Sequence, residues 1–135
     1  MSYLNPDPEK LPGIFAGLPD DTPIVMLNLL KFRDVAVYKG QPAGYSGREA
    51  YRRYSDIALK KLDEIGARVI YVGHMKATLI GPENEQWDEV LLVRYPSKQA
   101  FMGMMMQPDF FEATRHRTAA LADSRLVATI EATDI

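Results

Sequence analysis

The sequence contains no cysteine and only one tryptophan among its 135 residues. The absence of cysteine excludes thiol nucleophiles, zinc–thiolate sites and iron–sulfur clusters, and it fits a reducing compartment. The sequence also lacks a large excess of either charge: it has 16 Lys and Arg residues and 18 Asp and Glu residues, for a net charge of −2. A near-neutral chain lacks a strong electrostatic attraction to nucleic acid or anionic lipid. We therefore expect neither nucleic acid nor a membrane as a partner.

Long apolar runs are also missing from the sequence. No stretch approaches the roughly 18 apolar residues that cross a membrane, and the first residues lack the basic and apolar segments of a secretory signal. These features predict a cytoplasmic protein. Nucleotide binding, serine hydrolysis and zinc proteolysis have no motif support. The two histidines, His74 and His116, lack the spacing of metal ligands, so we expect no metal and no cofactor.

The hydrophobic content of 47% is that of one ordinary globular domain. Proline is concentrated near the N-terminus, where it prevents a long helix or a ladder strand. We therefore predict an N-terminal arm over residues 1–23 and a single domain over residues 24–135. Apolar residues at helical spacing within 11–18 predict one short turn that docks on the domain. The prolines of the arm are Pro6, Pro8, Pro12, Pro19 and Pro23.

The domain begins with residues 24–32, which are apolar on both alternating faces apart from Asn28 and Lys31. This pattern is typical of a strand that is covered on both sides. A long loop follows over 33–46. Loops of this length usually have a function or are mobile.

A capping box, Ser46-Gly47-Arg48-Glu49, predicts the start of a helix, in which Ser46 Oγ accepts the Glu49 amide and Glu49 reaches back to the cap. Gly66 is the expected end of this helix. A second long helix is predicted from Pro108 to about Asp123. Its expected inner face comprises Phe110, Phe111, Thr114, Thr118 and Leu121. The remaining predicted elements are strands over 67–80 with a bulge at Gly73, 87–95 and 124–131, and a short helix capped by Pro96-Ser97 and running through Met106.

The predicted order of elements is βαββαβ. With two right-handed crossovers, this order gives an α+β, ferredoxin-like fold: a four-stranded antiparallel sheet with both helices on one face. The other face then stays open, and a monomer would expose a large apolar surface, which soluble monomers rarely do. The simplest remedy is a homodimer that pairs through the open sheet face into an α+β barrel.

Several segments in this order resemble the domain-of-unknown-function 1330 family of the dimeric α+β barrel superfamily. They are Pro-x-x-Met-Leu-Asn-Leu-Leu-x-Phe at 23–32, Ser-Gly-Arg-Glu-Ala-Tyr-x-x-Tyr at 46–54, Trp-x-x-Val-Leu-Leu-Val-x-Tyr-Pro-Ser at 87–97, and Pro-Asp-Phe at 108–110 followed by Arg117. The resemblance covers about four-fifths of the chain. It implies a ferredoxin-like protomer that pairs sheet to sheet, in a family without an established reaction. Family members often carry a carboxylate just before the aromatic-Pro-Ser element, where this sequence has Arg94, so a role for that carboxylate is absent here or the ligand chemistry differs.

Three residues are candidates for catalysis: His74, Arg94 and Asn28. His74 and Arg94 lie on strands that are expected to pair, so we expect them to share a face. A histidine beside a cation resists protonation and acts as a neutral base, with Arg94 as an anion stabiliser. The structural alternative is that Arg94 pairs with an acidic residue and His74 is simply hydrogen-bonded. Asn28 interrupts an apolar strand, where it either orients a ligand or is a satisfied core amide.

Four further residues are candidates for ligand binding: Tyr38, Tyr54, Lys31 and Arg117. Tyrosines around the long loop are expected to line the mouth of a cavity, although packing explains Tyr54, and Tyr51 beside it, equally well. Lys31 near a strand end either binds ligand or snorkels to water. Arg117 matches a position where the family usually has arginine, and it either forms a structural ion pair or binds an anion. The methionines of 102–106 form either an adaptable binding surface or a core or dimer contact.

These observations predict a small-molecule-binding homodimer whose ligand lies between the sheet and the 33–46 loop. Resemblance to the superfamily's cofactor-independent oxygenases and isomerases implies proton transfer or oxygen chemistry on a small aromatic or carbonyl compound. One alternative is a non-catalytic ligand-binding or stress-associated module. Another is a vestigial cavity that leucine and methionine side chains pack shut.

Overall fold

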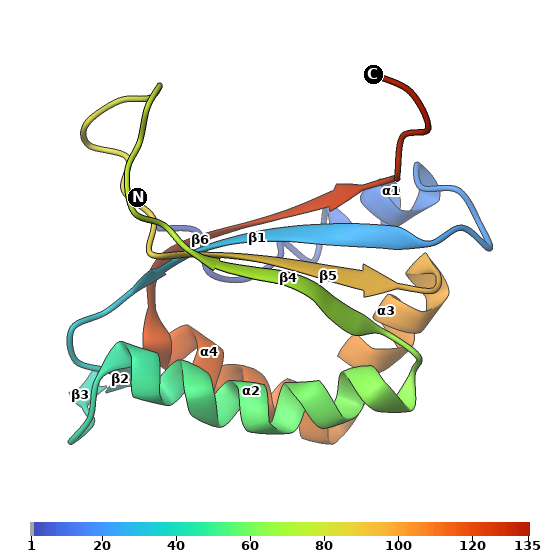
Figure 1. Ribbon diagram of the computed structural model, residues 1–135. Coiled ribbons are helices and arrows are strands. Elements are labelled where there is room, and N and C mark those ends of the chain that lie inside the picture. Colours follow the sequence, from blue (N-terminus) through green and yellow to red (C-terminus); the bar gives the residue numbers. More distant parts are fainter. Residues whose placement is uncertain (1) are drawn as a thin grey trace.

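The computed structural model describes residues 2–135 and confirms the predicted α+β, ferredoxin-like architecture (Figure 1). Four antiparallel strands form one sheet in the order β4-β5-β1-β6. This is the strand order of the split βαβ arrangement. The strands are β1 (Ile24–Phe32), β4 (Arg68–His74), β5 (Glu89–Tyr95) and β6 (Leu121–Thr129).

Both long helices lie side by side on one face of the sheet, below it in Figure 1. They are α2 (Gly47–Glu64) and α4 (Pro108–Ala120), and the short helices are α1 (Leu11–Ala16) and α3 (Lys98–Met105). A two-stranded hairpin, β2 (Val37–Tyr38) and β3 (Gln41–Pro42), forms within the predicted 33–46 loop. Positive φ angles at Lys39 (49°) and Gly40 (79°) make its tight turn.

Residues of β1 alternate between the two faces of the sheet. The buried set faces the helices and comprises Ile24, Met26, Asn28 and Leu30. The alternating set is only half-buried and lies on the open face; it comprises Val25, Leu27 and Leu29. Leu27 pairs with Leu92 of β5 and with Val127 of β6, so the apolar surface extends across the open face.

Strand β4 is shorter than the predicted 67–80, and its bulge lies elsewhere. The pairing with β5 shifts between Val69 and Tyr71 rather than at Gly73. Because the bulge adds one residue, Val69 before it and Val72 and His74 after it all pair with helix-facing residues of β5. The chain leaves the sheet after His74 and forms the loop that rises above the sheet in Figure 1.

The helix boundaries follow the predicted capping residues. Ser46 Oγ accepts the amide of Glu49 at 3.1 Å, but the Glu49 carboxylate pairs with Arg52 and Arg53 instead of reaching back to the cap. Gly66, with a φ of 75°, follows the end of α2. Ser97 Oγ caps α3 through the amide of Ala100.

Helix α4 starts at Pro108 as predicted but ends at Ala120, about three residues early. The chain enters β6 at Leu121, where pairing with Phe32 of β1 competes with a further helical turn. Phe110 is buried as expected, whereas Phe111 is exposed. Since one helical step turns the chain by about 100°, adjacent phenylalanines cannot both face the core.

The N-terminal arm docks on the domain, as predicted from its apolar spacing. Phe15 of α1 is buried and packs against Phe101, with ring centroids 5.8 Å apart. The buried Lys98 Nζ donates to the carbonyl oxygens of Phe15 and Leu18, both at 2.6 Å, and lies 3.2 Å from Asp20 Oδ1. The Lys98 ammonium group thus lies at the C-terminal end of α1, where carbonyl oxygens lack amide partners within the helix. These hydrogen bonds hold α1 against α3.

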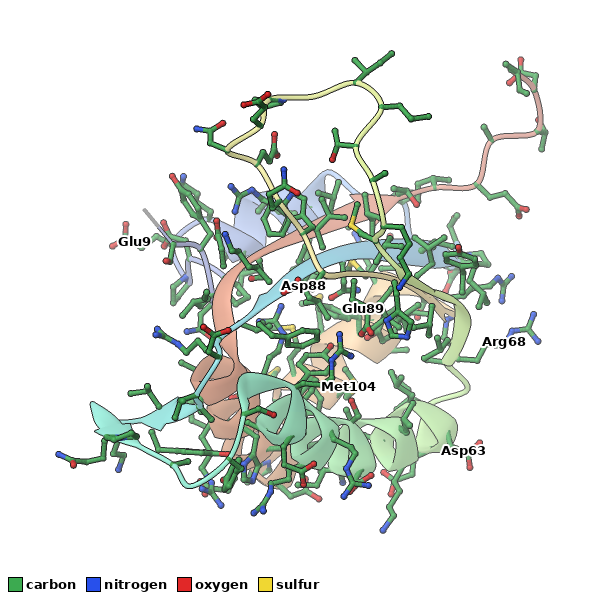
Figure 2. All side chains as sticks on the ribbon, turned by 60° about the vertical axis from the view of Figure 1, so that its left-hand side comes forward. Glu9, Asp63, Arg68, Asp88, Glu89 and Met104 are labelled. Atoms are coloured by element: carbon green, nitrogen blue, oxygen red, sulfur yellow. The ribbon has the colours of Figure 1, made fainter. Side chains whose placement is uncertain are left out.

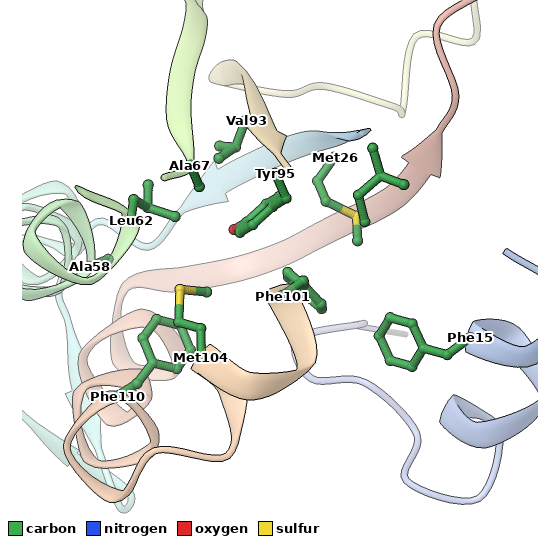
Figure 3. Close-up of a cluster of buried hydrophobic side chains, with 11 residues drawn as sticks. Phe15, Met26, Ala58, Leu62, Ala67, Val93, Tyr95, Phe101, Met104 and Phe110 are labelled. Atoms are coloured by element: carbon green, nitrogen blue, oxygen red, sulfur yellow. The ribbon is translucent and has the colours of Figure 1, made fainter. Parts of the chain in front are cut away.

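Figure 3 shows the larger cluster of buried side chains, which joins α1, α3, α4 and the helix-facing side of the sheet. Tyr95 of β5 and Phe101 of α3 meet edge to face within it, with centroids 4.9 Å apart. Met104 is buried in this cluster, whereas Met106 is exposed, so the methionine segment contributes mainly one side chain to the core. None of the described helices is both long enough and apolar enough to cross a lipid bilayer.

Candidate functional site

A cavity of about 450 Å³ lies between the sheet and the helices. This volume lies in the range of small-molecule sites. The interior is therefore not packed shut by leucine and methionine. The expected position between the sheet and the 33–46 loop is wrong, because the wall comes from the sheet, α2, α3, α4 and the arm. The apolar part of this wall includes Leu62, Val69, Val72, Leu91, Val93, Phe101, Met104 and Phe110.

Glu89 is a buried carboxylate in this wall. Its Oε1 lies 3.3 Å from Arg48 Nη1 and 3.4 Å from His74 Nδ1. Figure 2 shows Glu89 on the helix side of the sheet, toward Met104, whereas Arg68 points outward. Glu89 is not among the site residues predicted from the sequence. Its signal is an acidic side chain in phase with Leu91, Val93 and Tyr95 at the start of an otherwise apolar strand.

Asn28 lies in the cavity wall and is buried, as its position in β1 predicted. Its Nδ2 donates long hydrogen bonds to the carbonyl oxygens of Met26 (3.4 Å) and Leu91 (3.3 Å). Oδ1 has no hydrogen-bond partner within residues 2–135. Every fully buried polar side-chain atom in that range has one. Asn28 Oδ1 is therefore open to the cavity, where it can accept a hydrogen bond from a ligand.

Three tyrosines, Tyr51, Tyr54 and Tyr95, line the cavity together with Arg117. Burial raises the pKa of all three phenols, and the nearby Arg117 guanidinium opposes this shift. The phenols are thus neutral at physiological pH and serve as hydrogen-bond donors.

Arg117 donates to the carbonyl oxygen of Leu4 at 2.6 Å. The alternative of a structural ion pair is wrong, because no carboxylate in the described chain lies within ion-pairing distance of it. The same side chain lines a second cavity of about 390 Å³ between the arm and β6. Arg117 thus lies between the two cavities and lines both of them.

The expectation that His74 and Arg94 share a face is wrong. His74 pairs with Glu89 across the ladder, whereas Arg94 pairs with Arg68 and Val25. Glu89 and Arg94 are five positions apart on β5, and an odd difference in position places two side chains of a strand on opposite faces. His74 therefore lies at the rim of the cavity beside Glu89, and Arg94 lies on the open face.

Lys31 and Tyr38 also lie away from the cavity. Lys31 is exposed on the open face opposite Asp123, in keeping with the alternative that it snorkels to water. Tyr38 of the hairpin packs on α4, where its hydroxyl lies 2.7 Å from His116 Nδ1, and it also accepts a hydrogen bond from Tyr45 at 2.9 Å. Of the seven predicted site residues, the cavity wall contains Asn28, Tyr54 and Arg117.

The contact between Tyr38 and His116 predicts a pH dependence of stability. Burial lowers the pKa of His116 below its ordinary 6.5, helped by Arg115 and Arg53 and opposed by Glu112, while burial raises the pKa of Tyr38 to about 12. Neutral His116 accepts a hydrogen bond from the Tyr38 hydroxyl, and protonation of the imidazole removes that acceptor. The contribution of this hydrogen bond to the free energy of unfolding is complete above pH 6.5. It is lost as the pH falls from 6.5 through the lowered pKa of His116.

Urea unfolding at pH values from 8 to 5 measures this dependence. We expect His116→Asn, which keeps an acceptor without a titrating ring, to flatten the loss of stability below pH 6.5. An equal loss in His116→Asn and in the unchanged protein would contradict a role for His116.

The residues described, 2–135, contain no group of three His, Cys, Asp or Glu side chains placed to hold a metal ion. The donors of the cavity include phenols and guanidinium groups, and its acceptors include a carboxylate and an amide oxygen. This composition is suited to an organic molecule with polar groups at its ends.

The fold and the cavity together define a ferredoxin-like α+β protein with a ligand-sized interior. Comparison with known proteins is consistent with this class, although no family model and no curated protein matches the sequence. The solved structure of RPA0582, a protein of unknown function from Rhodopseudomonas palustris, is 34% identical with a TM-score of 0.90, and the match covers 99% of this chain and 100% of that one. The chain belongs to the same family as RPA0582.

More distant structures share the fold alone. A dimeric protein of unknown function and ferredoxin-like fold from Bacteroides fragilis is 13% identical, with a TM-score of 0.53 over 84% of this chain and 100% of that chain. A hydroxynitrile lyase from Passiflora edulis is 8% identical, with a TM-score of 0.57 over 85% of this chain and 98% of that one. The fold is thus found in proteins of unknown function and in an enzyme.

Proposed function

We propose that the protein is a cofactor-independent enzyme that moves a proton on a small aromatic or carbonyl compound bound between the sheet and the helices. The observation that carries this proposal is the buried Glu89 carboxylate, which lies between Arg48 and His74 at the rim of the cavity. Isomerisation and cofactor-independent oxygenation both begin with removal of a proton from the substrate. The proposal therefore concerns this shared step.

His74 serves as the base in this proposal, and Glu89 positions it. The Nδ1 atom of His74 faces the carboxylate at 3.4 Å, which favours the tautomer that leaves Nε2 free to accept a proton. Side-chain exposure of 61% leaves the imidazole accessible at the rim. Arg48 lies 3.3 Å from Glu89 on its other side, and the Glu89 carboxylate stabilises the imidazolium that forms on His74.

Asn28 orients the substrate through its free Oδ1, which accepts a hydrogen bond from a hydroxyl or amine of the ligand. Its Nδ2 is occupied by backbone carbonyls, so it is not the donor that stabilises a developing oxyanion. Arg117 and the phenols of Tyr51 and Tyr54 are the donors available for that purpose. Arg94 lies on the other face of the sheet, so the oxyanion role expected for it passes to these residues.

Deuterium exchange tests the proposed proton transfer. A thermal-shift screen of aromatic acids, quinones and lactones first identifies a ligand, because binding to the folded state raises the midpoint. The ligand is then incubated with the protein in D₂O, and the loss of its C–H signal is followed by NMR. We expect His74→Ala to slow this exchange by about 100-fold or more, while the other histidine variant, His116→Asn, exchanges at the original rate.

An unchanged rate in His74→Ala removes His74 from the mechanism. Saturable binding without exchange or product supports the alternative, a non-catalytic ligand-binding or stress-associated module. The structural similarity to the Passiflora edulis hydroxynitrile lyase supports only the capacity of this fold to hold an active site.

We also propose that the functional unit is a homodimer that pairs through the open sheet face. The similar protein from Bacteroides fragilis is described as dimeric, and the open face here carries Leu27, Leu29, Val90, Leu92 and Val127 without a covering helix among the described elements. In such a dimer, Arg94 and Lys31 face the partner subunit. We further propose that the chain and RPA0582 belong to the domain-of-unknown-function 1330 family, with residues 1–23 as an arm and 24–135 as the domain.

A further inference from the structure

The cavity contains one cation that no described carboxylate neutralises. Arg117 has five N–H donors; one donates to the carbonyl oxygen of Leu4, and another interacts with the Tyr51 hydroxyl. The other arginines of the wall, Arg48 and Arg52, differ because Glu89 lies 3.3 Å from Arg48 and Glu49 lies 3.1 Å from Arg52. A half-buried guanidinium in an apolar wall is costly unless it meets an anion.

The surroundings of Arg117 are suited to an anion. The phenols of Tyr51, Tyr54 and Tyr95 all lie close enough for the guanidinium to oppose the rise of their pKa. Burial keeps these groups protonated, so they donate hydrogen bonds to an anion and do not repel it. The Tyr51 hydroxyl interacts with Arg117, the hydroxyls of Tyr54 and Tyr95 take no part in the side-chain hydrogen bonds of the described residues, and all three side chains line the cavity.

The cavity is chemically polarised. Donors without a partner carboxylate gather around Arg117, whereas Glu89 and Asn28 Oδ1 supply acceptors elsewhere in the wall. Aliphatic and aromatic side chains, among them Val72 and Met104, make up most of the remaining wall. An occupant that satisfies this pattern has an anionic head and an apolar body.

We infer that the ligand of this cavity is a small hydrophobic monocarboxylic acid, whose carboxylate is bound by Arg117 and the phenols of Tyr51, Tyr54 and Tyr95. This inference rests on the proposed function in placing the ligand in the cavity, and it adds the chemical class. Arginine matches a carboxylate through two parallel N–H donors, which a neutral amide or ester cannot use in the same way. The apolar body extends along the wall toward Glu89 and His74.

A matched pair of probes tests the class of ligand. We use 2-naphthoate and its neutral isostere 2-naphthamide, and measure binding to the whole chain by isothermal titration calorimetry. We expect naphthoate to bind at least about tenfold more tightly than naphthamide. Arg117→Met should remove this preference and keep naphthamide binding, whereas Arg117→Lys should keep part of it.

The control is Arg115→Met, which removes an arginine two residues away on α4 that pairs with Glu112 outside the cavity. This variant should keep the full preference. Tyr54→Phe removes one hydroxyl and keeps the ring, so it should weaken naphthoate binding several-fold and leave naphthamide binding unchanged. This second variant tests the inference even if Arg117→Met fails to fold.

Each outcome decides the inference. Equal binding of the two probes, or a preference that persists in Arg117→Met, overturns the carboxylate class and leaves the proposed function standing. If neither probe binds to the unchanged protein, the carboxylate class is overturned, and the deuterium-exchange experiment decides the proposed function separately. Proton exchange on a neutral carbonyl compound, with no binding of naphthoate, supports the proposed function and overturns this inference.

Discussion

Replacing Gly47 by alanine is expected to lower the free energy of unfolding by about 3 kcal/mol, because three backbone segments meet at this residue. Gly47 donates its amide to the carbonyl oxygen of Arg33 at 3.0 Å, and the Arg33 amide donates to the carbonyl oxygen of Ala120 at 2.8 Å. A Cβ at position 47 would overlap both carbonyl oxygens and the Arg33 nitrogen. These atoms belong to backbone, so they cannot rotate away as a side chain would.

Urea unfolding followed by circular dichroism measures the loss. Gly44→Ala, three residues earlier in the loop that precedes α2, is the matched control, because a Cβ there meets no atom within 4 Å. We expect that control to change the free energy of unfolding by less than about 0.5 kcal/mol. Equal stability of the two variants would show that the junction of β1, α2 and α4 relaxes around an added methyl group.

Replacing Leu92 by glutamate is expected to raise the dissociation constant of the proposed dimer by about 100-fold or more. Leu92 pairs with Leu27 on the open face, and two-fold symmetry places the substitution twice in one interface. Each introduced carboxylate would lose its hydration in the interface without a cation or hydrogen-bond donor to replace it. The monomer should still fold, because this face is open to solvent in the single chain.

Sedimentation equilibrium over a range of protein concentrations measures the dissociation constant. Val35→Glu is the control, since Val35 is already 48% exposed and lies in the loop between β1 and β2, outside the four-stranded sheet. It should leave the dissociation constant unchanged. A monodisperse monomer at micromolar concentration of the unchanged protein would overturn the proposal that the open face pairs.

Much of the fold could be predicted from local patterns. Ser46, Gly66, Ser97 and Pro108 act on their own neighbours through caps and fixed dihedral angles, so they mark helix ends without knowledge of the rest of the chain. The alternation in β1 likewise predicted a strand with two apolar faces. The strand order then followed from connection rules.

The candidate site was less predictable because it depends on register. A single bulge in β4, between Val69 and Tyr71, sets which of its residues face the helices, and nothing local specifies where that extra residue lies. For this reason His74 shares a face with its ladder partner Glu89 and not, as predicted, with Arg94. Tyr38 was misplaced for a similar reason, because the hairpin that carries it docks on α4 through a contact 78 residues away in the chain.

The sequence alone determined the class of this protein: without cysteine, with near-neutral charge and with the order βαββαβ, it predicts one ferredoxin-like domain with an open apolar face. Tertiary structure alone decided which polar groups share the interior. Helix caps and strand alternation are set by residues close in the chain. The meeting of Glu89 with Arg48 and His74, and of Arg117 with three tyrosines, depends on the pairing of distant segments.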